Sequence, residues 1–191
     1  MPNLPSIPLP DRLDLLRRAR VALEREIASH PAPDLPEPSP TLQQRWGAFV
    51  TLRDRSSNEL RGCIGRMTSD RPLWATVEKL VLQSAREDHR FTPVNAKEVD
   101  NLRIDISVLS ALLPIDSPEE MEVGLHGIQI ENGGHRAVFL PQVPLDMGWN
   151  REETLRQACQ KAGIEETAIH APDTRFWIFY SISFSEPNSL S

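Results

Sequence analysis

Cys63 is the residue in this chain best suited to chemistry, because it lies beside a fixed positive charge in the segment LRGCIG, residues 60–65. In an extended segment the side chains alternate between two faces, which places Arg61 and Cys63 on one face with Glu59. Residues two apart are separated by about 6.6 Å along a strand, so the Arg61 guanidinium can reach over the Cys63 sulfur. A cation there favours the thiolate, the form of cysteine that acts as a nucleophile or redox group.

A nucleophilic cysteine also needs a base. His126 is the best candidate, because it precedes Gly127, the first residue of a second predicted hairpin. That hairpin would be equivalent to the one that contains Cys63. We therefore predict Cys63 and His126 as the catalytic residues if the protein is an enzyme.

The same segment also fits a binding surface. A glycine inside a strand marks a bulge or a close approach to the backbone, and Gly62 and Gly65 flank the thiol on opposite faces. Arg90 ends a predicted helix, where it can bond the last carbonyls or join this surface. Free cysteines also pack as small hydrophobic residues, so catalysis, recognition and packing all stay open for Cys63. The predicted binding residues are Leu60, Arg61, Gly62, Cys63, Ile64, Gly65 and Arg90.

The remaining polar residues give weaker indications of a site. His135 follows a predicted turn, and His30 and His170 lie in predicted loops. Asp105 is on a predicted strand, either facing solvent or serving as a carboxylate of the site. No pair of metal-binding residues has CxxC, HxH or HExxH spacing, and no glycines match GxGxxG or GxxxxGK[ST]. We expect no metal, no nucleotide and no other cofactor.

The first part of the chain predicts a helix followed by a connector. Asp11 can cap a helix that runs to about Ser29, with an apolar stripe formed by Leu13, Leu16, Ala19, Leu23 and Ile27. Residues 31–40 include five prolines, which neither a helix nor a central strand accommodates. This stretch is therefore predicted to be an extended connector.

From Trp46 onward the pattern predicts a hairpin, a helix and a strand. Apolar alternation at 46–52 is followed by turn residues at 54–58 and by the LRGCIG strand. A helix is expected from Pro72 to about Asp88, and a strand over residues 102–110.

The same order then recurs in the second half. Residues 127–131 and 136–140 predict a hairpin around an Asn-Gly-Gly turn. A helix should begin after Asn150 and end at Gly163, with Cys159 in its apolar face. The last strand is predicted over 176–184, with one face formed by Phe176, Ile178, Tyr180, Ile182 and Phe184. The repeated order predicts a structural duplication.

Composition narrows the class of protein. The chain has 191 residues, 39% hydrophobic and 25% charged, which fits one domain or two small lobes that share a core. A net charge of −6 and a pI of about 5.4 disfavour nucleic-acid binding. No apolar run approaches the roughly 20 residues that cross a bilayer, and the N-terminus lacks a signal-peptide pattern. We expect a cytoplasmic protein with reduced thiols and with neither nucleic-acid nor membrane partners.

From Trp46 to Phe184 the chain resembles the AMMECR1 family, called AmmeMemoRadiSam system protein A in bacteria and archaea. His89 stands where the family pattern usually has a proline, so it is not expected to be a family-wide functional group. Besides LRGCIG, the segments that carry the resemblance are AFVTL (48–52), SAREDHRF (84–91), LRIDISVLS (102–110), EVGLHGIQIENG (122–133) and FLPQVPLDMGWNREETLRQACQKAGI (139–164).

The resemblance implies an α+β fold, in which duplicated hairpin-helix-strand units form an antiparallel sheet with flanking helices. It also implies two unequal subdomains around a cleft that LRGCIG would face. The predicted domains are residues 1–45 (helix and proline-rich connector), 46–186 (the AMMECR1-like domain) and 187–191 (a tail). The resemblance links the chain to Memo-like and radical-SAM proteins but implies no activity.

Two functions therefore stay open. The first is an accessory or binding protein, whose cleft receives a partner protein or a sizeable ligand. The second is a cysteine-dependent enzyme with Cys63 as nucleophile or redox thiol.

Overall fold

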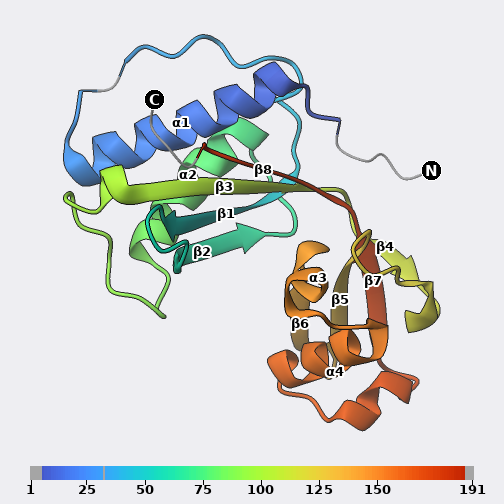
Figure 1. The fold of residues 1–191 in the computed structure, drawn as a ribbon. Helices are drawn as coiled ribbons and strands as arrows, with labels where there is room; N and C mark the ends of the chain where they lie inside the picture. The colour runs from blue at the N-terminus through green and yellow to red at the C-terminus, as the bar shows by residue number, and fades with distance from the viewer. Residues whose placement is uncertain (1–5, 32, 188–191) are drawn as a thin grey trace. The chain divides into compact units, whose positions relative to one another are not determined.

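The computed structural model describes residues 6–31 and 33–187 of the chain. It forms two compact units (Figure 1). Of the described residues, the N-terminal unit contains those from Ser6 to Leu109 and from Ile182 to Pro187, and the central unit is Ser110–Ser181. The predicted domain boundaries at residues 45 and 186 thus fall inside the N-terminal unit. The cleft predicted between two subdomains stays a prediction.

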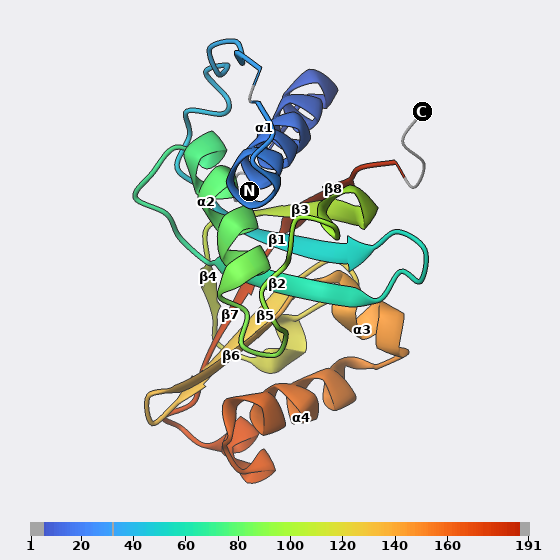
Figure 2. The ribbon, with the colours of Figure 1, turned by 90° about the vertical axis from the view of Figure 1, so that its left-hand side faces the viewer.

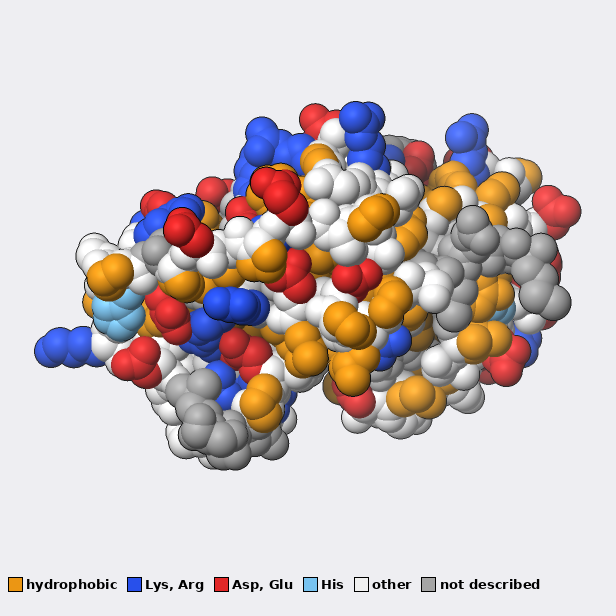
Figure 3. All heavy atoms as spheres, turned by 90° about the horizontal axis from the view of Figure 1, so that it is seen from above, with side chains coloured by type: hydrophobic (Ala, Val, Ile, Leu, Met, Phe, Trp, Pro, Cys, Tyr) orange, Lys and Arg blue, Asp and Glu red, His pale blue; other side chains and the backbone are white. Residues whose placement is uncertain are grey.

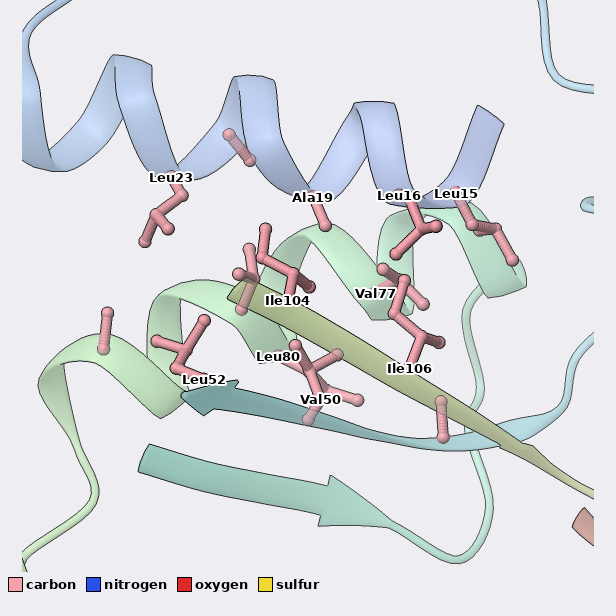
Figure 4. Close-up of a cluster of buried hydrophobic side chains, with 14 of the residues drawn as sticks. Leu15, Leu16, Ala19, Leu23, Val50, Leu52, Val77, Leu80, Ile104 and Ile106 are labelled. Carbon is pink, nitrogen blue, oxygen red and sulfur yellow. The ribbon is translucent and has the colours of Figure 1, made fainter. Parts of the chain in front are cut away.

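The N-terminal unit is a four-stranded antiparallel sheet with two helices on one face (Figures 1 and 4). The strand order is β2-β1-β3-β8, so β2 is an edge strand. Every second residue of β1 is buried, because the strand turns that face toward the helices. The elements are α1 (Leu9–Ala28), β1 (Gly47–Asp54), β2 (Leu60–Arg66), α2 (Leu73–Arg86), the 3₁₀ helix η1 (Val99–Asn101), β3 (Leu102–Leu109) and β8 (Ser181–Ser185).

Helix α1 differs from its prediction at its start and at one position of its apolar stripe. It begins at Leu9, so Asp11 lies in the first turn and is not the cap. Leu13 is 57% exposed, while Leu15 is fully buried. The rest of the predicted stripe is confirmed. Leu16, Ala19 and Leu23 are buried in the cluster that Figure 4 shows, and Ile27 packs against it.

The proline-rich connector has no helix or strand over its described residues 29–31 and 33–39, as predicted. Arg18 of α1 fixes it in place. Its guanidinium donates to the carbonyl of Pro36 and to the Asp14 carboxylate (2.8 Å) and lies over the Trp74 ring. Arg18 is 5% exposed, so a paired buried cation anchors the connector on the helices.

The central unit is a second four-stranded antiparallel sheet, with α4 packed on one face (Figure 2). Asn150 caps α4, as predicted, by accepting a hydrogen bond from the N–H of Glu153, and Gly163 ends the helix in a left-handed conformation. Cys159 is buried in the core of this unit, which confirms its predicted packing role. The elements are β4 (Leu113–Ile115), η2 (Pro118–Glu120), β5 (Gly127–Asn132), β6 (His135–Phe139), α3 (Gln142–Met147), α4 (Arg151–Ala162), η3 (Glu166–His170) and β7 (Arg175–Phe179).

The predicted duplication is present in the strand pairing. In each half the strand after the helix pairs with the first strand of the hairpin: β3 with β1, and β7 with β5. This gives the corresponding orders β2-β1-β3 and β6-β5-β7. Each repeat is followed by one strand that joins the sheet of the other repeat. β4, which follows β3, pairs with β7, and β8, which follows β7, lies beside β3.

This exchange corrects the prediction of a single last strand over 176–184. The chain forms β7 in one sheet and β8 in the other, with a break at Tyr180. Ser110 holds the break, since its N–H donates to the Tyr180 carbonyl and its hydroxyl accepts from the Tyr180 N–H, both at 2.9 Å. Alternation alone could not reveal a change of sheet.

Side chains of both charges are interspersed with hydrophobic ones over the face that Figure 3 shows. Among the residues that the structure describes, no helix combines the length and the hydropathy needed to span a membrane.

Candidate functional site

The LRGCIG segment forms the edge strand β2, and a bulge interrupts it. Gly62 lies opposite Leu52, but the next residue of β1, Arg53, lies opposite Leu60. Arg61 is therefore the extra residue of a β-bulge. The predicted alternation holds from Gly62 to Gly65 and fails at Arg61, because a bulge re-aims the side chain of its extra residue.

Arg61 consequently pairs with a different group from the one predicted. Its guanidinium donates to both carboxylate oxygens of Glu98, at 2.7 and 3.3 Å, and to the carbonyl of Thr92 at 2.8 Å. The Arg61 hydrogen bond lowers the pKa of Glu98 below its ordinary value. The guanidinium thus holds the 92–98 loop against β2.

The main chain of Cys63 is bound by residues just after α2. Its N–H donates to Asp88 at 2.8 Å, and its carbonyl accepts from Arg90 at 3.4 Å. The Arg90 guanidinium also makes two hydrogen bonds to the Asp88 carboxylate, at 2.9 and 2.7 Å. These hydrogen bonds, above all those from Arg90, hold the pKa of Asp88 far below its usual range. Arg90 therefore caps the edge of the sheet with a side chain that is 53% exposed, and its role in binding stays a prediction.

Gly62 allows α2 to lie directly on β2. A Cβ at this position would come within 2.1 Å of the Ser84 carbonyl oxygen. The Ser84 hydroxyl accepts from the N–H of Ile64 and donates to the carbonyl of Val50, so it bridges β2 and β1. The close approach predicted from this glycine is made by the chain itself.

Gly65 has the corresponding role on the other face of the sheet. A Cβ there would lie 2.1 Å from the Phe49 ring, which covers the glycine from the neighbouring strand. The two glycines thus face opposite sides, as predicted, and each accommodates a neighbour of its own unit.

The face of the N-terminal sheet opposite the helices carries the Phe49 ring and otherwise small or polar side chains, and we call it the outer sheet face. Cys63 is half-buried there, and the Thr51 hydroxyl donates to its sulfur at 3.2 Å. Asp105, opposite Thr51, accepts from Arg53 at 3.1 Å and from Arg103 at 3.0 Å. The outer sheet face consists of Phe49, Thr51, Arg53, Cys63, Gly65, Arg103, Asp105, Ser107 and Ser183.

The binding residues predicted from the sequence include only Cys63 and Gly65 of the outer sheet face. Thr51 and Ser107 alternate with the core residues of β1 and β3, so reading the polar positions of each strand would have placed both on one surface. The sequence does not decide whether Asp105 faces solvent or the site, and the structure assigns it to this face.

His126 lies in the central unit at the start of β5, and both of its ring nitrogens have partners there. Nδ1 accepts from the N–H of Glu122 at 3.1 Å, and Nε2 lies 3.1 Å from the Tyr180 hydroxyl. The ring is 7% exposed, and burial lowers the pKa of His126 below its usual value. The neutral tautomer with its proton on Nε2 satisfies both contacts. This is the geometry of a structural histidine.

Neither a metal cluster nor a disulfide is found among the described residues. No group of three or more histidine, cysteine, aspartate or glutamate side chains within residues 6–31 and 33–187 is placed to hold a metal ion. Cys63 and Cys159 are both free thiols.

The fold and the LRGCIG edge define an α+β protein of two hairpin-helix-strand repeats, and comparison places it in a family. The AMMECR1 family model matches residues 16–184, so the chain belongs to the AMMECR1 family. This confirms the resemblance from the sequence and extends it into α1.

Curated relatives and a solved structure agree with this assignment. A protein of Thermococcus gammatolerans is 38% identical over 181 residues, covering 90% of this chain and 88% of its own. A protein of Methanothermobacter thermautotrophicus is 35% identical and covers 90% and 92%. The crystal structure of uncharacterized protein PH0010 from Pyrococcus horikoshii matches with a TM-score of 0.83 at 35% identity, covering 90% of this chain and 89% of that one.

Proposed function

We propose that this AMMECR1-family chain is an accessory or binding protein that recognises a partner through the outer sheet face and the adjoining LRGCIG strand. The observation that carries the proposal is the contrast between the two faces of one sheet. The helix side is filled by aliphatic residues, whereas the other side presents a thiol, hydroxyls and the Asp105–arginine cluster. Polar groups that hydrogen-bond to one another on a sheet suit specific recognition, because their positions are fixed before a partner binds.

The bonding around Cys63 also supports recognition over catalysis. The predicted activating cation, Arg61, is paired with Glu98, and the nitrogens of His126 are paired within the central unit. Asp88 and Arg90 bind the main chain of Cys63 and leave its side chain on the outer sheet face.

Memo-like and radical-SAM proteins are the partners that the family resemblance implies. The test is whether the purified chain binds the Memo-like and radical-SAM proteins of the same organism in a pull-down experiment. Ser183→Arg places a large side chain at an exposed position of the outer sheet face, and Thr68→Arg adds the same side chain at an exposed position outside it. We expect Ser183→Arg to reduce binding about tenfold or more, because the large side chain would clash with a partner that covers the outer sheet face.

Arg61 gives a second arm of this experiment. Arg61→Ala and Glu98→Ala both break the same ion pair, but only Arg61→Ala removes the guanidinium. Loss of binding in Arg61→Ala alone indicates direct contact with the partner. Equal binding by wild type, Ser183→Arg and Arg61→Ala, or no binding of either partner by wild type, would rule the proposal out.

A cysteine-dependent enzyme is the second candidate, and the 3.2 Å hydrogen bond from Thr51 to the Cys63 sulfur favours it. The rate of thiol alkylation in the native protein across a pH series distinguishes the enzyme from the binding protein. Buried Cys159 is the internal control, and Cys63→Ser identifies which signal comes from Cys63. Fast labelling of Cys63 below pH 7 supports the enzyme, because the thiolate is the reacting form. Labelling at the rate of an ordinary thiol excludes it.

A further inference from the structure

A groove of about 1200 Å³ lies within the central unit, on elements that none of the predicted site residues occupies. Its walls are η2 with the following residues 121–123, the first turns of α4, and η3. Small-molecule sites are typically about 300–1,000 Å³, so this groove has room for a segment of polypeptide.

The floor of the groove is apolar and attached to the core. Met121 and Leu155 belong to the buried cluster of the central unit, and Val123 and Ile169 pack against that cluster while lining the groove. Apolar surface in a concavity is a favourable site for an apolar side chain, because covering it removes both surfaces from water. Methionine adapts its shape to such a side chain.

The rim is strongly acidic. The Nε of Arg151, the one arginine in the lining, donates to the Met121 carbonyl at 3.0 Å, which ties it to the wall. The Glu120 carboxylate is fixed by the N–H groups of Asp116 and Ser117, at 3.0 and 3.2 Å. The lining contains five carboxylates, those of Glu119, Glu120, Glu122, Glu152 and Glu166.

We propose that this acidic groove binds a segment of a partner protein in which an apolar side chain stands between lysine or arginine residues. The apolar side chain would lie on the Met121–Leu155 floor, and the basic groups would meet the glutamate rim. An amphipathic helix laid into a groove is the recurring form of such recognition. A ligand with carboxylates or phosphates would face the repulsion of five glutamates against one arginine.

This surface is independent of the outer sheet face, because its lining residues all belong to the central unit. A chain with both surfaces would join two partners. If the experiment on one surface contradicts its proposal, the proposal for the other surface is unaffected.

The probe is a fluorescein-labelled helical peptide of leucine, lysine and alanine, with the leucines on one face, followed by fluorescence anisotropy. A matched peptide replaces every lysine by glutamate. The groove variant is Glu122→Lys/Glu152→Lys, and the control is Asp146→Lys/Asp173→Lys, which changes two exposed acids of the same unit outside the lining. The net charge changes equally in both variants.

We expect the leucine–lysine peptide to bind wild type and the control variant equally, and the groove variant about tenfold or more weakly. The glutamate peptide should not bind wild type. Ile169→Ser should also weaken binding, with thermal unfolding as a check that it folds. Equal binding by the groove and control variants overturns the proposal, as does self-association of wild type that the groove variant abolishes, because the occupant would then be a second copy.

Discussion

The main-chain N–H of Cys63 donates a 2.8 Å hydrogen bond to the carboxylate of Asp88, and this bond joins the edge strand β2 to the end of α2. Two segments that carry the family resemblance, LRGCIG and SAREDHRF, therefore meet at one place. Arg90 completes the junction by binding both the carboxylate and the Cys63 carbonyl. The edge of the sheet is thus closed at Cys63, which removes a position where another strand could pair.

Asp88→Asn tests this junction. The Asp88 side chain is 5% exposed and accepts charge-assisted hydrogen bonds, so the substitution should lower the free energy of unfolding by about 1–3 kcal/mol at pH 7. The folded-state pKa of Asp88 is lowered, so its contribution is present above the unfolded value of about 3.9 and is lost as the pH falls below about 4. Urea unfolding of wild type and Asp88→Asn at pH 7 and at pH 3 measures the change in the free energy of unfolding.

Asp70→Asn is the matched control, because Asp70 is exposed. It should unfold like wild type at both pH values. A deficit in Asp88→Asn that is the same at pH 7 and at pH 3 would show that the carboxylate charge does not contribute.

Much of the secondary structure could be predicted from sequence, because alternation, proline and helix-capping residues are local signals. The hairpin at β1 and β2, the limits of α4 and the order of the repeated units follow from such patterns. The bulge at Arg61 does not, since the register depends on how β1 pairs with β2. The pairing of Arg61 with Glu98, 37 residues away, is likewise not evident from the alternation.

Side-chain partners distant in sequence were also beyond prediction. Gly127 does begin β5, as expected, but the ring of His126 bonds to Tyr180, 54 residues away. The break at Tyr180 that moves the chain from one sheet to the other likewise depends on Ser110. The acidic groove combines η2, α4 and η3, of which only α4 has a clear sequence pattern.

Gly62→Ala should destabilise the N-terminal unit. The new Cβ would lie 2.1 Å from the Ser84 carbonyl oxygen, and backbone on a helix cannot turn aside as a side chain can. Overpacking of this kind costs about 1–3 kcal/mol, measurable as a lower midpoint in urea unfolding. Ser185→Ala, at an exposed strand position, serves as the control. Wild-type stability in Gly62→Ala would mean that α2 does not need to approach β2 this closely.

Gly65→Ala should be relieved by a change at Phe49. The new Cβ would come within 2.1 Å of the Phe49 ring, so the single substitution costs about 1–3 kcal/mol. In the double variant Phe49→Leu/Gly65→Ala the smaller side chain leaves room, and the loss should be less than the sum of the two single losses. A double-mutant cycle from urea unfolding gives the coupling. Strict additivity would contradict the packing of the ring on the glycine.

His126→Gln should change how stability depends on pH. Burial lowers the folded-state pKa of His126 below the unfolded value of about 6.5, so the neutral ring contributes fully above that pH. The contribution is lost as the pH falls from 6.5 through the folded pKa, at about 1.4 kcal/mol for each unit of difference. Glutamine does not titrate, so the free energy of unfolding of His126→Gln should fall less than that of wild type between pH 7 and pH 5.

His135→Gln, at an exposed histidine, should follow the wild-type curve. Parallel curves for wild type and His126→Gln would show that protonating this ring does not oppose folding, and would reopen a role for it outside the structure of the central unit.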